Sequence, residues 1–179
     1  MTVAGLLRSW GTRELRALSI RQPHASLVAL GEKHVETRSR LTKYRGPIAI
    51  ASSASWKRVS KERACEDPAF RAAWRRHADV VDDVHDLPLG VIVAVGFVVD
   101  CVPSETIVAQ KRRRLALASV RCGRSEIAFG DYSPRRFGWV LADIHRLEVP
   151  VPCKGALGIW HLPTPTRAQL IRSRIIFAD

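Results

Sequence analysis

Residues 21–45 bring together most of the side chains that could bind or transform a charged ligand. The side chains of interest in it are four cations, one carboxylate, one amide and one phenol ring: Arg21, Lys33, Arg38, Arg45, Glu36, Gln22 and Tyr44. Guanidinium groups pair with phosphates through two parallel hydrogen bonds, and an aromatic ring offers a face on which a nucleobase can stack. The residue types therefore predict a cleft that binds a polyanion, with nucleic acid as the candidate ligand.

The spacing within residues 34–38 predicts how the charged groups are arranged. In a strand, successive side chains point to opposite faces, which places His34, Glu36 and Arg38 on one face. Glu36 and Arg38 would then form an ion pair that holds the site and leaves guanidinium donors for a ligand. A surface salt bridge without any ligand is the alternative interpretation.

The same side chains also allow a hydrolytic interpretation. Cleavage of RNA through its 2′-hydroxyl needs a base, an acid and a cationic group that stabilises the charged transition state. Lys33 and His24 are the candidate bases, and Lys33 with Glu36 is the candidate catalytic pair. The candidate nucleic-acid-binding residues are Arg21, Gln22, His24, Lys33, Arg38, Tyr44, Arg45 and Ser133.

Charge is the strongest compositional signal. The 179 residues include 29 Lys and Arg against 17 Asp and Glu, so the formal net charge is +12 and the isoelectric point is about 10.6. An isoelectric point above about 9 is typical of nucleic-acid-binding domains. Attraction to an anionic membrane surface or solubility alone would also account for the net charge, and a GC-rich genome would account for the excess of arginine over lysine. The basic run at residues 111–114 is either a solvated helix face or a further contact.

We expect no metal, no cofactor and no membrane-spanning segment. Cys65, Cys101, Cys122 and Cys153 lack C-x-x-C spacing, and the six histidines lack H-x-x-x-H spacing, so neither a zinc site nor a redox pair is predicted. The longest apolar run, residues 90–99, is about half of the ~20 residues that a membrane-spanning helix needs. Since no secretory signal is found either, we expect a cytoplasmic protein.

Apolar periodicity predicts six strands and four helices. The strands are expected at about residues 17–20, 34–38, 48–51, 90–100, 137–144 and 156–162. The helices are expected at about residues 23–30 and 68–81, from Ser104 onward and from Thr164 onward. Because strands and helices do not alternate regularly, the predicted class is α+β: a small six-stranded, mostly antiparallel β-barrel with flanking helices.

Three ordered blocks of sequence resemble one known family. Residues 31–38 match the pattern G-x-K-x-x-E-x-R of the ASCH domain family, which is similar in fold to the PUA RNA-binding barrel. The flanking S-x-R-Q-P-x-A at residues 19–25 and Y-R-G-P at residues 44–47 resemble the flanks of its bacterial members and of an animal branch. The blocks at residues 129–139 and 150–155 resemble the bacterial branch. The resemblance covers about residues 16–163.

The resemblance implies a PUA-like barrel with one cleft. Lys33, Glu36 and Arg38 would lie in this cleft, Arg21 and Gln22 would face them, and Tyr44 and Arg45 would lie at the rim. It also implies one domain over residues 16–163, with a helical insertion at about 56–86, an N-terminal extension at 1–15 and a helical tail at 164–179.

The function implied is binding of RNA or single-stranded nucleic acid, possibly DNA, in the basic cleft. A hydrolase that uses the same cleft is the alternative: a ribonuclease, or an amidohydrolase that acts on N4-acetylcytidine. Lys33 matches the lysine of those amidohydrolases, but Glu36 stands where they have threonine. Their distant glutamate has no clear counterpart, because Glu105 is the nearest candidate and a poor one.

Overall fold

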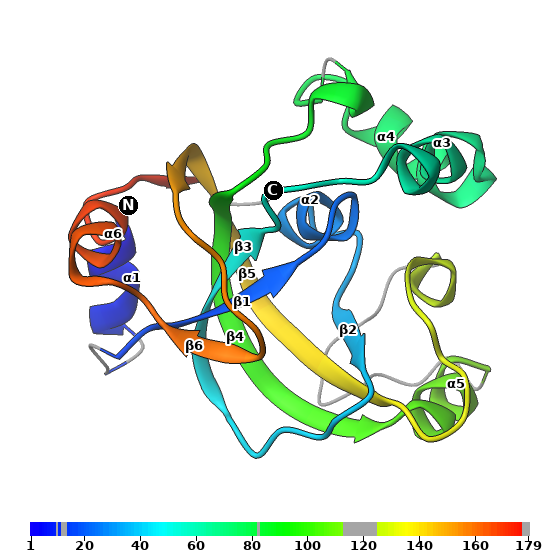
Figure 1. Cartoon of the computed structure of the whole chain (residues 1–179). Coiled ribbons are helices and arrows are strands. Elements are labelled where there is room, and N and C mark those ends of the chain that lie inside the picture. The colour runs from blue at the N-terminus through cyan, green and yellow to red at the C-terminus, as the bar shows by residue number, and fades with distance from the viewer. Residues whose placement is uncertain (10, 12–13, 82, 113–124, 177–179) are drawn as a thin grey trace.

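A six-stranded mixed sheet curls into a half-barrel at the centre of the molecule (Figure 1). The computed structural model describes residues 1–9, 11, 14–81, 83–112 and 125–176. The order of the strands is β2-β5-β4-β3-β1-β6, and the two-residue strand β7 pairs with β5 outside this path. The strands are β1 (Arg16–Ile20), β2 (Val35–Arg38), β3 (Gly46–Ser52), β4 (Val91–Pro103), β5 (Phe137–Pro152), β6 (Ile159–His161) and β7 (Ile175–Ile176).

Most strand pairs are antiparallel, as the sequence predicts. Only the β1–β3 pair is parallel among the described strands. The register of β4 against β5 shifts at three places, between residues 92 and 94, 95 and 97, and 98 and 100. Such irregularities bend a strand and increase its twist, which suits these two long strands to a curled sheet. The expected α+β class with a mostly antiparallel barrel-like sheet is confirmed.

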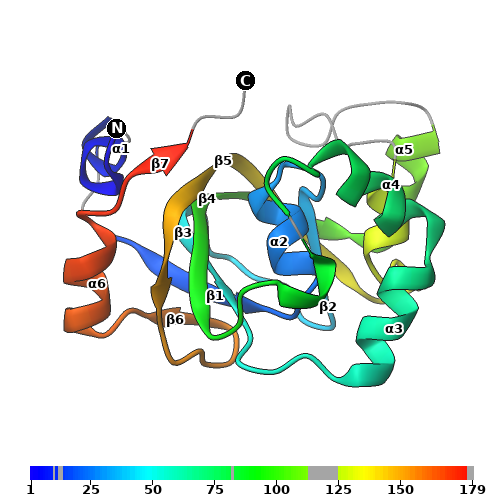
Figure 2. The same ribbon diagram turned by 90° about the horizontal axis from the view of Figure 1, so that it is seen from above.

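The helices cover the sheet from two sides (Figures 1 and 2). α1 and α6 lie together on one side, and α3, α4 and α5 lie on the other, with α2 beside the sheet. The helices are α1 (Val3–Ser9), α2 (His24–Ala29), α3 (Arg58–Glu66), α4 (Pro68–Arg76), α5 (Ser104–Arg112) and α6 (Thr164–Leu170), with 3-10 turns η1 (Val84–Asp86) and η2 (Glu126–Phe129).

Both faces of the central strands are buried, because the side chains of a strand alternate between its faces. In β1, Ala17 belongs to the apolar cluster under α1 and α6, whereas Leu18 belongs to the cluster against α2. In β3, Ala49 and Ile50 divide between the same two clusters. This explains why the strands are nearly continuous apolar runs.

One helical prediction needs correction, and two helices lie where no helix bounds were predicted. The helix predicted to reach residue 81 ends at Arg76, because the chain turns at His77, whose carbonyl accepts from Val80 N and Val81 N. Its start is as predicted, since Asp67 accepts from Ala69 N at 2.8 Å. The helix α1 was not predicted. The helix α3 falls within the helical insertion expected at about residues 56–86, but its own bounds were not predicted, because it is short and has only one buried residue.

The two ends of the described chain pack against each other. Val3 N and Ala4 N donate to Ser173 O and Ile171 O, both at 2.9 Å.

The helix expected to begin at Ser104 is present as α5, but residues 113–114 of the basic run and Cys122 lie outside the described residues. In the described part of the chain, no helix combines the length and the apolar character needed to cross a membrane.

Candidate functional site

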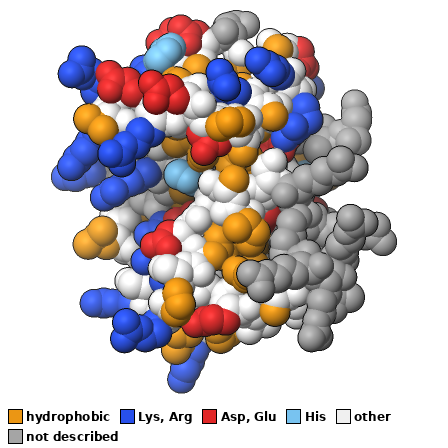
Figure 3. Space-filling view, turned by 90° about the vertical axis from the view of Figure 1, so that its right-hand side faces the viewer, with side chains coloured by type: hydrophobic (Ala, Val, Ile, Leu, Met, Phe, Trp, Pro, Cys, Tyr) orange, Lys and Arg blue, Asp and Glu red, His pale blue; other side chains and the backbone are white. Residues whose placement is uncertain are grey.

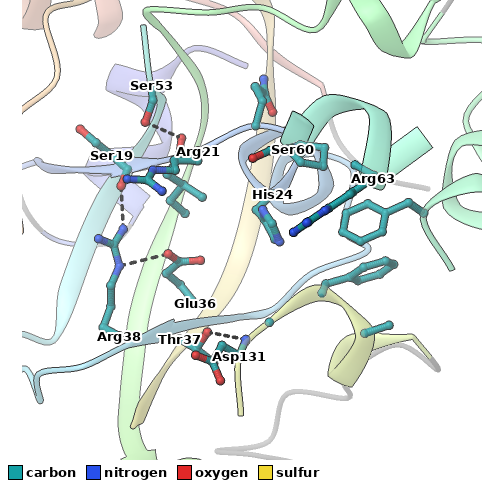
Figure 4. A pocket seen from close by; sticks show the side chains of 18 of the residues that line it. Ser19, Arg21, His24, Glu36, Thr37, Arg38, Ser53, Ser60, Arg63 and Asp131 are labelled. Atoms are coloured by element: carbon teal, nitrogen blue, oxygen red, sulfur yellow. Dashed lines mark hydrogen bonds and ion pairs between the residues drawn. The ribbon is translucent and has the colours of Figure 1, made fainter. Parts of the chain in front are cut away.

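A pocket of about 780 Å³ lies between the curled sheet and the helices α3 and α4 (Figure 4). β1, the start of α2 and β2 supply one part of its wall, and α3 and α4 supply another. Residues 128–131 and the loop before β6 complete it. Its charged lining residues are Arg21, Arg38, Arg63, Arg136, Glu36, Asp67 and Asp131.

An ion pair on β2 stands at the centre of this pocket. Arg38 Nε lies 3.0 Å from Glu36 Oε1, which confirms the pairing predicted from strand alternation. Arg38 Nη2 also donates to Ser19 O of β1 at 2.6 Å, so the guanidinium joins two strands that are not neighbours in the sheet. Both Glu36 and Arg38 line the pocket.

Lys33 does not line the pocket, contrary to the sequence prediction. Its side chain is fully buried, and its ammonium donates to Phe129 O at 2.8 Å and to Val35 O. Its Nζ lies 3.8 Å from Glu36 Oε2. The cause is local: Gly31, with φ +73°, ends α2 as predicted and turns the chain inward before β2 begins. Alternation along residues 33–38 then puts Lys33, Val35 and Thr37 on the buried face.

Glu126 is a buried partner of this region that sequence reasoning missed. Its carboxylate accepts from His34 N at 2.8 Å and from Val35 N at 3.1 Å, and it has no exposed surface. Burial alone would raise the pKa of Glu126, but hydrogen bonds from His34 and the charge of Lys33 outweigh it and hold the pKa below its usual value. Glu126 and Lys33 therefore fasten β2 to the turn η2.

His24 points into the pocket from the first turn of α2 (Figure 4). Its ring packs edge-to-face on Phe70 with centroids 5.7 Å apart. Burial and, second, the charge of Lys33 lower the pKa of His24 to about 3. The imidazole is therefore neutral at physiological pH, and it lines the pocket as a polar ring without a charge.

Two arginines of the pocket have no acidic partner among the described residues. Arg21 follows β1 and Arg63 belongs to α3, and both side chains are exposed. Arg136, by contrast, pairs with Asp131 at 3.2 Å. Figure 4 shows Arg63 reaching toward His24 from the side of α3. Sequence reasoning missed Arg63, because α3 has little apolar periodicity to mark it as a helix.

The structure does not present the other four predicted binding residues to a ligand in the pocket as the sequence predicts. Gln22 lines the pocket, but it is 2% exposed and its amide groups bind Pro88 O and Ser26 N. The remaining three do not line the pocket. The hydroxyl of Tyr44 donates to Pro47 O at 2.5 Å, Arg45 pairs with Asp100 at 2.9 Å, and the carbonyl of Ser133 accepts from Ser104 at 2.8 Å.

Further basic side chains lie on the face of the molecule that carries α3. Figure 3 views the side of the molecule that carries α3, α4 and α5, and it shows Lys and Arg side chains gathered along one edge. The helix α3 alone carries Arg58, Lys61 and Arg63.

No group of three or more metal-binding side chains occurs within the described ranges. Of the four cysteines, the structure describes three, Cys65, Cys101 and Cys153, and each is a free thiol.

Comparisons with known proteins point to one family. Residues 18–150 match the family described as the ASCH domain. The solved structure of ASCH from Zymomonas mobilis is similar, with 12% identity, coverage of 88% of this chain and 93% of that chain, and a TM-score of 0.49. A Tyr-to-Phe variant of that protein has 13% identity, coverage of 89% of this chain and 97% of that chain, and a TM-score of 0.48. A Ser-to-Ala variant has 12% identity, coverage of 89% of this chain and 95% of that chain, and a TM-score of 0.50. No curated protein matches the chain.

Proposed function

Because this chain belongs to the ASCH domain family, we propose that its pocket binds RNA or another single-stranded nucleic acid. The observation that carries this proposal is the pair Arg21 and Arg63, which face one pocket from different elements without an acidic partner in the described part of the chain. Guanidinium groups left without carboxylates are ready to bind phosphate.

The shape of the pocket favours a single strand. A volume of about 780 Å³ is enough to admit an unstacked nucleotide with its phosphate. Single strands can splay their bases into such a pocket, whereas a duplex keeps them stacked and paired. Arg63 of α3, which lines the pocket, would then contact a neighbouring phosphate.

The hydrolytic alternatives have less support. Lys33 is fully buried and its ammonium already contacts two carbonyl oxygens, so it does not reach a substrate in the pocket. A pKa of about 3 makes His24 a weak base at neutral pH. Glu36 faces the pocket, but its Oε1 is held by Arg38. The geometry therefore fits binding better than ribonuclease or amidohydrolase chemistry.

The test measures the affinity of a fluorescently labelled single-stranded RNA dodecamer by anisotropy over a series of salt concentrations. For single strands, the logarithm of affinity falls by about 0.7 per phosphate contact for each logarithmic unit of salt. Arg21→Gln and Arg63→Gln should each weaken binding and make this slope shallower by about 0.7. Arg172→Gln is the matched control, because Arg172 is exposed, lies after α6 and is not part of the pocket.

Two results would contradict the proposal. Equal losses in all three variants would mean that binding is diffuse attraction to the whole basic surface. Equal affinity for a duplex of the same sequence would remove the role of the pocket. Incubation of the same RNA with the protein, followed by electrophoresis, checks for cleavage, and we expect none.

A further inference from the structure

Glu36 is unexpected in a pocket that binds phosphate. Its side chain is 13% exposed and lines the pocket, as do four arginines. A phosphate placed against this carboxylate would be repelled by its negative charge. In a nucleic acid, the part that faces Glu36 would therefore be an uncharged base that carries hydrogen-bond donors.

The carboxylate of Glu36 is held in a fixed orientation. Arg38 Nε lies 3.0 Å from Oε1, and the buried Lys33 Nζ lies 3.8 Å from Oε2. A carboxylate can accept about four hydrogen bonds, so each oxygen keeps the capacity to accept from a ligand. Figure 4 shows the carboxylate directed into the same space as His24 and Arg63. The pocket thus presents two adjacent acceptors in one plane.

We propose that Glu36 binds the Watson–Crick edge of an unpaired guanine, and this inference rests on the proposed nucleic-acid binding. Guanine offers two neighbouring donors on this edge, N1–H and the N2 amino group, which match the two carboxylate oxygens. Adenine, cytosine and uracil each place an acceptor beside their donor. That acceptor would face the second oxygen of Glu36 and be repelled, so the site selects against these bases.

The surroundings of Glu36 agree with a base at this position. The His24 ring, backed by Phe70, supplies a polar wall that carries no charge at neutral pH and so does not compete with the base for the carboxylate. Arg21 and Arg63 remain available for the phosphates on either side of the base. A nucleotide whose base faces Glu36 would thus have both arginines in the same pocket as partners for its flanking phosphates.

The experiment compares five single-stranded RNA nonamers that differ only at the central base of a uridine-rich sequence. The central base is guanine, hypoxanthine (introduced as inosine), adenine, cytosine or uracil, and affinity is measured by fluorescence anisotropy at one salt concentration. Hypoxanthine lacks only the N2 amino group, so the nonamer that contains it should bind roughly tenfold more weakly than the guanine nonamer. The adenine, cytosine and uracil nonamers should bind at least as weakly.

The variant Glu36→Gln replaces one acceptor with a donor and should remove the preference for guanine without weakening binding of the uracil nonamer. The matched control is Asp131→Asn, which removes the same charge from the pocket and frees Arg136 in the same way. This control should keep the preference for guanine. A thermal melt of each variant verifies that it is folded.

The outcomes separate the two proposals. Equal affinity of the wild-type protein for guanine and hypoxanthine would overturn this inference, whatever the variants do. Persistence of the preference in folded Glu36→Gln would overturn it as well. If none of the nonamers binds, the proposed function fails and the guanine site fails with it.

Discussion

Replacement of Lys33 by methionine tests whether this residue stabilises the structure beneath the pocket rather than contacting the ligand. The methionine side chain matches most of the length of the lysine stem but removes the ammonium. Phe129 O and Val35 O would lose their donor, and Glu36 would lose one of its two cationic neighbours. Glu126 would lose the nearby positive charge that helps to keep it ionised.

The expected cost is large compared with the stability of a domain. Removing one partner from a buried ionic group typically costs about 3–5 kcal/mol. In a chain of this length, 1 kcal/mol corresponds to about 2–4 °C in melting temperature, so Lys33→Met should melt about 10 °C lower than the wild-type protein. Urea unfolding followed by tryptophan fluorescence measures the free energy of unfolding directly, since the chain has five tryptophans.

The matched control is Lys43→Met, because Lys43 is exposed and lies in the loop between β2 and β3, away from the pocket lining. Its free energy of unfolding should stay within about 0.5 kcal/mol of the wild-type value. If Lys33→Met were as stable as this control and yet failed to bind nucleic acid, our assignment of Lys33 to the structure would be refuted. The lysine would then act on the ligand itself.

Three further predictions concern the edges of the pocket. Because the pKa of His24 is about 3 when folded and 6.5 is its ordinary value, the unfolded chain binds the proton first, and stability falls as pH falls from 6.5 toward 3. Urea unfolding should show about 2 kcal/mol of this loss between pH 7 and pH 5, and His24→Gln should lack it. Leu157→Ser should leave the melting temperature unchanged, since Leu157 is 96% exposed, yet weaken RNA binding roughly fivefold if a base packs on it. Asp67→Ala should cost about 1 kcal/mol of unfolding free energy by removing the cap of α4.

Much of the sheet could be predicted because its strands are apolar runs bounded by glycine and proline. The pairing of Glu36 with Arg38 followed from the two-residue period of a strand and is confirmed. The same period also places residue 33 on the opposite, buried face, so the sequence contained the signal for the burial of Lys33. The resemblance to the ASCH pattern instead implies that Lys33 lies in the cleft, and we apply the strand period only from residue 34 onward.

The rest of the site depends on contacts between distant parts of the chain. Glu126 accepts from residues 91 and 92 positions earlier, and no local pattern reveals such a contact. Arg63 belongs to a helix whose stability comes from packing beside α4 rather than from an apolar stripe of its own. Local periodicity cannot locate side chains of this kind, because their positions are set by tertiary packing.

The helical segment at residues 56–86 joins two strands that are already paired with each other. Ser52 Oγ donates to Val91 O at 3.1 Å, and Gly90 N donates to Ser53 O at 3.2 Å, so the hairpin of β3 and β4 is closed by its own hydrogen bonds. The segment between these residues carries Arg63 and Phe70 of the pocket wall and packs on Leu27 and Phe129. A chimera that replaces it with a segment that again covers Leu27 and Phe129 would keep β3 and β4 paired and change the side chains that contact the ligand.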